Sequence, residues 1–146
     1  MTTFKVYTDA SSRYKAIVED VGSERQLRKV YPSSIGAVIK DGEQVVGAIS
    51  ERIGFSDSNY AEFLAMYTAC RYLIDHNISK VDFYADCLNL VMMVNQQIIS
   101  GIPELRKLSY AILDCLNQIE NYTITWIPRN SNKEAHHMAA QAFKVS

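Results

Sequence analysis

The chain has 146 residues, of which 48% are hydrophobic and 21% are charged, a composition typical of one globular domain with a sizeable core. Its formal net charge is −1, which excludes the strong overall attraction to polyanions that a basic domain has, so any nucleic-acid contact must come from local patches. Three cysteines in apolar segments fit reduced thiols, and neither a membrane-length apolar run nor a signal-peptide pattern is present, so we expect one cytoplasmic domain, residues 1–146, without membrane contact.

The first half of the chain predicts strands. Residues 4–9 alternate as a strand does, and residues 34–40 are rich in β-formers. Asp41-Gly42 is a strong hairpin signal, so residues 44–55 are expected to return as a third strand, antiparallel to the second. Residues 10–33, between the first two strands, are polar and charged, and we expect a long loop there.

That expected loop holds the best candidate for a basic patch. From charge alone, a solvated, mobile loop is the favoured interpretation, and contact with nucleic-acid phosphates is the alternative, for which Arg25, Arg28 and Lys29 are the candidate residues. Its cations, which outnumber Glu19, Asp20 and Glu24, are Arg13, Lys15, Arg25, Arg28 and Lys29.

The second half alternates helices and strands. An apolar stripe with helical spacing begins after residues 56–59 and runs to about Asn77, and Gly101-Ile102-Pro103 separates two later helices. The resulting order β-β-β-α-β-α-α-β-α implies a mixed sheet with antiparallel strands first and crossovers afterwards. The remaining elements are a strand at 80–85, helices at 88 to about 100 and 104–120, a strand at 122–127, and a helix that residues 130–132 cap and that reaches about Phe143.

Three acidic residues stand at element ends. Asp9 comes late in the first strand, Glu62 in the first turn of the first helix, and Asp86 directly after the fourth strand. Each has a structural alternative: Asp9 could begin a turn, Glu62 could form a capping box with Asn59, and Asp86 could be an N-cap. Together the three residues predict a metal site. The carboxyl ends of neighbouring strands meet in a crevice, and carboxylates held close together there need a cation such as Mg²⁺ or Mn²⁺.

Four segments of the chain resemble type 1 ribonuclease H and its plant-type and reverse-transcriptase-associated relatives. They occur in the family's order and spacing, between about residues 3 and 143. The segments are Val6-Tyr7-Thr8-Asp9-Ala10-Ser11, residues 58–65 (SNYAEFLA), residues 84–91 (YADCLNLV) and residues 126–139 (WIPRNSNKEAHHMA).

The resemblance implies an α/β ribonuclease H-like fold, with a five-stranded mixed sheet in the order 3-2-1-4-5 and about four helices. It also implies a two-metal endonuclease that hydrolyses the RNA strand of RNA–DNA hybrids. Asp9 would bridge both ions, and Glu62 and Asp86 would hold the second. Ser11 and Asn59 match positions that contact nucleic acid.

The last segment departs from the family pattern. Where relatives usually carry Asp as the fourth metal ligand, this chain has His136, which plant-type relatives also show. Imidazole is a poor Mg²⁺ ligand but serves Mn²⁺ or Zn²⁺, so the site is expected to favour manganese or to act slowly with magnesium. The alternative is an ordinary surface histidine. His137 points about 100° away around the helix and is expected at the surface.

Two other functions fit the same fold. One is a catalytically silent nucleic-acid-binding or interaction module, which would gain nothing from three repelling carboxylates. The other is a 3′–5′ exonuclease, which expects Asp-x-Glu in the first strand, where this chain has Asp9-Ala10-Ser11. The residues therefore favour the endonuclease, although residues 10–33 replace the short turn with which relatives sense the 2′-hydroxyls of RNA.

Overall fold

Seven strands and four α-helices follow one another within residues 2–13 and 15–144, which the computed structural model describes, without the side chains of 15–17, 28–30 and 55. The strands are β1 (Phe4–Ser12), β2 (Lys15–Val21), β3 (Glu24–Val30), β4 (Pro32–Asp41), β5 (Gln44–Phe55), β6 (Lys80–Ala85) and β7 (Asn121–Trp126). The helices are α1 (Ser58–Asp75), α2 (Leu88–Gln96), α3 (Pro103–Leu116) and α4 (Lys133–Gln141), and the short 3-10 helix η1 (Arg129–Ser131) precedes α4.

Five of the strands form one mixed sheet in the order β5-β4-β1-β6-β7. β1 pairs antiparallel with β4 and parallel with β6, while β7 extends the sheet in parallel beyond β6. This is the order 3-2-1-4-5 for the strands of the sheet, so the expected fold class is confirmed. The first and fourth strands of the sheet, which carry or precede Asp9 and Asp86, are therefore neighbours.

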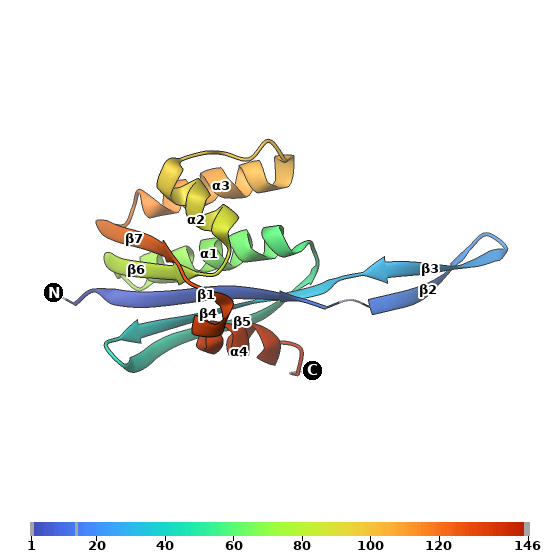
Figure 1. The fold of residues 1–146 in the computed structure, drawn as a ribbon, viewed down its shortest axis with the longest axis horizontal. Coiled ribbons are helices and arrows are strands. Elements are labelled where there is room, and N and C mark those ends of the chain that lie inside the picture. The colour runs from blue at the N-terminus through green and yellow to red at the C-terminus, as the bar shows by residue number, and fades with distance from the viewer. Residues whose placement is uncertain (1, 14, 145–146) are drawn as a thin grey trace.

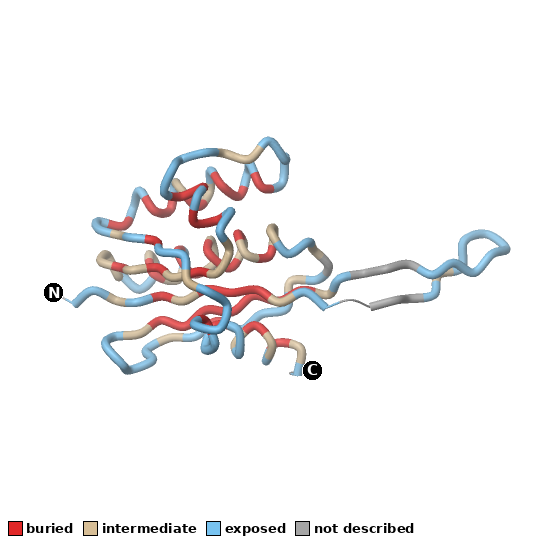
Figure 2. Tube along the Cα trace, in the orientation of Figure 1, coloured by how far each residue is buried: buried red, intermediate tan, exposed pale blue. Residues whose placement is uncertain are grey.

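Helices cover both faces of the sheet. α1, α2 and α3 lie on one face and α4 lies on the other (Figure 1). The core fills the space between the sheet and α1, where Val6, Ile39 and Phe83 of the strands meet Met66 and Leu73 of the helix (Figure 2). Among the described helices, none has the length and apolar character needed to span a membrane.

Helix α4 sits against the sheet because a glycine makes room for it. A Cβ atom on Gly36 would overlap the backbone of Ala135 and Ala139, so only glycine allows this approach. The hydroxyl of Ser34, two residues earlier, donates a hydrogen bond to the carbonyl of Ala139. The position of His136, which lies between these two alanines on α4, therefore depends on β4.

The prediction of a long loop between the first two strands was wrong. β1 continues to Ser12, and β2 and β3 form a two-stranded hairpin joined at Gly22, whose φ of +65° suits glycine. This hairpin, residues 15–30, is called the arm below. It projects from the body of the protein (Figure 1) and its described residues are almost all exposed (Figure 2).

Candidate active site

Asp9 lies just beyond the point where the pairing between β1 and β6 ends. β6 pairs with β1 only as far as Thr8 and Ala85, so Asp9 is the first residue of β1 beyond the end of its parallel neighbour. Its residue surface is 0% exposed. Because the strand continues past it, the alternative that Asp9 begins a turn is wrong.

The capping alternatives for the other two carboxylates are also wrong. Asp57 is the N-cap of α1, and its side chain accepts a 2.8 Å hydrogen bond from the backbone N–H of Tyr60. Asn59 is therefore inside the first turn and forms no capping box with Glu62. Cys87, not Asp86, is the N-cap residue of α2. Both carboxylates are left free for another role.

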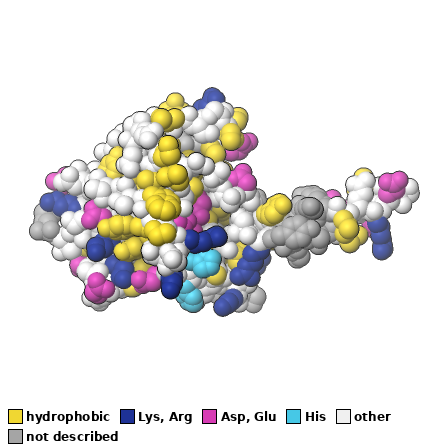
Figure 3. All heavy atoms as spheres, viewed as in Figure 1, with side chains coloured by type: hydrophobic (Ala, Val, Ile, Leu, Met, Phe, Trp, Pro, Cys, Tyr) yellow, Lys and Arg dark blue, Asp and Glu magenta, His cyan; other side chains and the backbone are white. Residues whose placement is uncertain are grey.

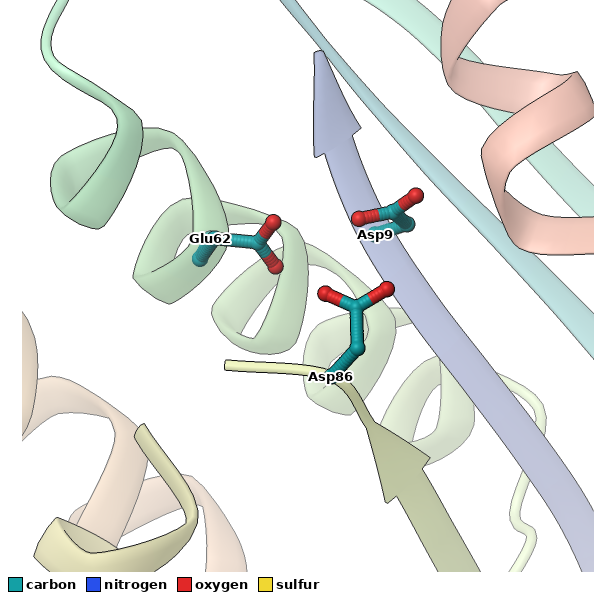
Figure 4. Close-up of side chains that lie close together, drawn as sticks. All are labelled: Asp9, Glu62 and Asp86. Carbon is teal, nitrogen blue, oxygen red and sulfur yellow. The ribbon is translucent and has the colours of Figure 1, made fainter. Parts of the chain in front are cut away.

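The three carboxyl groups converge from three elements. One oxygen each of Asp9, Glu62 and Asp86 lies within 4.8 Å of the other two. Figure 4 shows Glu62 reaching from α1 towards Asp9 on β1, with Asp86 rising from the end of β6 between them. Nδ1 of His136, on α4, lies 3.2 Å from Oδ2 of Asp9. The structure thus brings together all four residues that the sequence proposed as metal ligands.

Burial makes this arrangement costly without a cation. Burial, with the nearby charge of Asp9 adding to it, raises the pKa of Glu62 to about 10. Burial, followed by the charge of Asp86, also raises the pKa of Asp9. Oδ1 of Asp9 and Oε2 of Glu62 are buried without a hydrogen-bond partner among the described residues. Hard divalent cations prefer such oxygens, so the residues fit a Mg²⁺ or Mn²⁺ site.

Asn132 is the N-cap residue of α4, as the sequence predicts, but the contacts of its side chain with the site were not predicted. The side chain is only 1% exposed and points inwards. Its Nδ2 donates to the carbonyl of Thr8 at 2.8 Å and to Oδ2 of Asp86 at 3.1 Å. Asn132 therefore links β1, α4 and the Asp86 carboxylate. The sequence signal for this role was the place of Asn132 within the fourth resembling segment, residues 126–139.

Arg129 was missed as well. It lines an open hollow of about 320 Å³ together with Glu62, Asp86, Asn59 and Cys87, and Ser58 completes the lining. Its position in η1, directly after β7, brings a guanidinium group to the rim of the carboxylate cluster. Within the motif, the sequence signal was a cation directly after the proline that ends the last strand.

Two residues of this hollow have defined contacts. Oδ1 of Asn59 accepts a 3.4 Å hydrogen bond from Nδ2 of Asn89 and a 3.9 Å contact from the thiol of Cys87. Burial raises the pKa of Cys87 to about 11, so its thiol stays neutral. Asn59 therefore lies beside the carboxylates with its amide held by α2, at a position where it can meet a ligand.

The remaining expected nucleic-acid contacts lie along β1 and the arm. Ser11 lies two residues beyond Asp9 on the same strand and pairs with Ser34. Arg25 is on the arm, exposed and 3.5 Å from Asp20, while the side chains of Arg28 and Lys29 lie outside the described residues. The structure thus separates Arg25 from the carboxylates. His137 is exposed, as expected.

Comparisons with known proteins bear on the family and the fold of the chain. The family model described as reverse transcriptase-like matches residues 26–142. No curated protein matches the chain in sequence.

Solved structures resemble the whole chain. RNase H1 from the halophilic archaeon Halobacterium salinarum aligns with a TM-score of 0.81 at 21% identity and covers 99% of both chains. The N-terminal RNase H domain of a Mycobacterium tuberculosis protein aligns at 0.81 and 19% identity, covering 99% of this chain and 95% of that chain. An RNase H1 isolated from compost, solved in complex with an RNA/DNA hybrid, aligns at 0.78 and 21% identity over 97% of both chains. Since the family model spans most of the chain and these structures share its fold, the chain belongs to the reverse transcriptase-like family and has the ribonuclease H fold.

Proposed function

We propose that the chain is a metal-dependent endonuclease that hydrolyses the RNA strand of RNA–DNA hybrids. The observation that carries the proposal is the cluster of Asp9, Glu62 and Asp86, whose oxygens lie within 4.8 Å of one another. Such a cluster destabilises a metal-free protein, and a binding module would gain nothing from it. The hybrid bound to the compost RNase H1 supports the choice of substrate.

The four side chains at the site would hold Mg²⁺ or Mn²⁺. When bound, these ions lower the pKa of water and neutralise charge on the phosphate and the leaving oxygen. Asp9 would contribute to both ends of such a site, because its carboxylate lies close to Glu62 and Asp86 and also 3.2 Å from Nδ1 of His136. Asn132 holds Asp86 in position through its 3.1 Å hydrogen bond.

Two further residues that line the hollow, Arg129 and Asn59, would hold the nucleic acid. Arg129, at the rim of the hollow, supplies a guanidinium group that pairs with a phosphate of the substrate. Asn59 presents an amide beside Glu62, suited to the sugar or base next to the cleaved bond. Neither group carries a negative charge, so both complement a polyanion where the carboxylates do not.

His136 is expected to set the metal preference. A neutral imidazole beside Asp9 suits Mn²⁺ better than Mg²⁺, so His136→Asp should raise activity with Mg²⁺ relative to Mn²⁺. His136→Ala should lower activity without abolishing it, because three carboxylates remain. Identical metal preference and activity in all three proteins would show that His136 is not a ligand.

The direct test is cleavage of labelled RNA–DNA hybrid, double-stranded RNA and single-stranded RNA with Mg²⁺ or Mn²⁺. Asp86→Asn should reduce hybrid cleavage at least about a hundredfold while leaving the circular dichroism spectrum unchanged. Asp114→Asn, which removes an exposed carboxylate on α3, is the matched control and should cleave normally. Wild-type protein that binds hybrid but cuts no substrate with either metal would instead identify a non-catalytic binding module.

A further inference from the structure

The arm is a direct continuation of the strands that carry the site. Ser12 pairs with Ser33, and Lys15 pairs with Val30, three residues further along each strand, so the register is the same on both sides. The hydroxyls of Ser12 and Ser33 are 2.8 Å apart, and the N–H of Arg13 donates to the carbonyl of Pro32 at 2.8 Å. This continuity fixes the start of the arm relative to Asp9.

The arm contributes little to the stability of the domain. β2 and β3 pack mainly against each other, and Val18 and Leu27, which are paired across the strands, are 62% and 78% exposed. An isolated two-stranded hairpin is only marginally stable in water. Two exposed apolar side chains on such a hairpin are better explained by contact with a partner than by packing in the monomer.

The net positive charge of the arm and of the residues at its base, called its root below, favours a polyanion as that partner. Residues 13–29 contain five cations and three anions, a net charge of +2, in a chain whose total is −1. At the root, the guanidinium groups of Arg13 and Arg52 lie 4.4 Å and 5.7 Å from the ring centre of Phe143, which keeps both cations in place without neutralising them. Figure 3 shows Lys, Arg and His side chains gathered over α4 towards this root.

We propose that the arm lies along the phosphate backbone of the hybrid and extends the footprint of the protein by about seven base pairs to one side of the cut. The length follows from the seven residues of each strand, which at about 3.3 Å per residue span about 23 Å. Base pairs of a B-form duplex are about 3.4 Å apart along the axis, so on that spacing the arm spans about seven of them. The inference rests on the proposed function for its substrate.

The test measures binding, so that it does not depend on cleavage. The inactive Asp86→Asn protein is titrated with two hybrids, one that ends next to the cut on the arm side and one that extends 12 base pairs further. An arm-free version has residues 14–31 replaced by Asn-Gly, a two-residue hairpin turn. The dissociation constant for the short hybrid, divided by that for the long hybrid, should be about tenfold larger with the arm than without it.

A second variant covers the case in which the arm-free protein does not fold. Arg25→Gln, Arg28→Gln and Lys29→Gln together should lower the ratio and reduce the salt slope of binding to the long hybrid by about 0.9 for each phosphate that the arm no longer neutralises. The matched control removes three cations away from the arm, Lys5→Gln, Lys80→Gln and Lys107→Gln, and should leave the ratio unchanged.

Each outcome separates the two proposals. An equal ratio with and without the arm, or the same salt slope in the Arg25 triple variant and the wild type, overturns the role of the arm, even if the wild type cleaves hybrid. Arm-dependent dimers in sedimentation equilibrium, with unchanged hybrid binding, overturn it too and assign the arm to a second copy of the chain. Arm-dependent binding without any wild-type cleavage overturns the nuclease proposal and leaves the arm as a duplex contact.

Discussion

In the absence of metal, Glu62→Gln is expected to stabilise the protein at neutral pH. Burial and the nearby Asp9 raise the pKa of Glu62 from 4.5 to about 10, so the folded protein keeps this carboxyl protonated where the unfolded chain ionises it. Below pH 4.5 both states are protonated and the penalty is absent. As the pH rises towards 10, the unfolded state gains stability by ionising, and the free energy of unfolding falls. Glutamine cannot ionise, so the variant loses this pH dependence.

The size of the effect follows from the two pKa values. Each pH unit above 4.5 lowers the free energy of unfolding by about 1.4 kcal/mol, which gives about 4 kcal/mol at pH 7.5. Asp9 is raised in pKa as well and shares the proton, which reduces the gain from removing one carboxylate. We therefore expect about 2 to 4 kcal/mol. For a chain of this length, that corresponds to an increase in Tm of roughly 7 to 13 °C.

Thermal and urea unfolding at pH 5 and pH 8, in the presence of EDTA, measure this difference. The wild type should be less stable at pH 8 than at pH 5, and Mn²⁺ should restore its stability by displacing the proton. Glu62→Gln should show little change between the two pH values and a smaller response to Mn²⁺. Glu51→Gln, at an exposed position on β5, is the matched control and should follow the wild type. Equal pH dependence in Glu62→Gln and the wild type would refute the reasoning, because Glu62 would then be ionised in the fold.

Three other substitutions test residues that surround the candidate active site. Gly36→Ala should push α4 off the sheet, which lowers the free energy of unfolding by about 1 to 3 kcal/mol in urea and weakens Mn²⁺ binding through His136. Asn132→Ala removes two hydrogen bonds and should cost about 1 to 3 kcal/mol, with Mn²⁺ affinity about tenfold lower by calorimetry. Arg129→Ala should lower kcat/KM for hybrid about tenfold or more while Mn²⁺ affinity stays the same; a parallel loss of Mn²⁺ affinity would contradict its role as a phosphate contact.

The sequence was sufficient to predict the convergence of the three carboxylates. Asp9 and Asp86 follow neighbouring strands, and the positions of strand ends depend mainly on alternation and crossover rules, which the chain obeys. Glu62 follows from the start of a strongly periodic helix. These are local patterns with one three-dimensional solution, which is why the main sheet and its site agree with expectation.

The caps and the arm could not be predicted in the same way. Residues 56–59 are all good capping residues, and only the approach of α1 to the sheet selects Asp57. The side chains that the structure describes in the arm form no buried face, so the alternation that identifies a half-buried strand is missing from a segment rich in charge. The inward turn of Asn132 depends on Thr8, 124 residues away, which no local pattern contains.

The replacement of the usual aspartate by His136 changes the balance between stability and metal binding. A fourth carboxylate at this position would lie against Asp9, whose burial already raises its pKa, and would add to the repulsion among Asp9, Glu62 and Asp86. An imidazole at 3.2 Å from Asp9 instead attracts it when protonated and can donate a hydrogen bond to it when neutral. The metal-free fold is therefore less strained than it would be with aspartate. If His136 is a metal ligand, as proposed, the same exchange removes one hard anionic ligand, and affinity for Mg²⁺ should be lowered more than affinity for Mn²⁺.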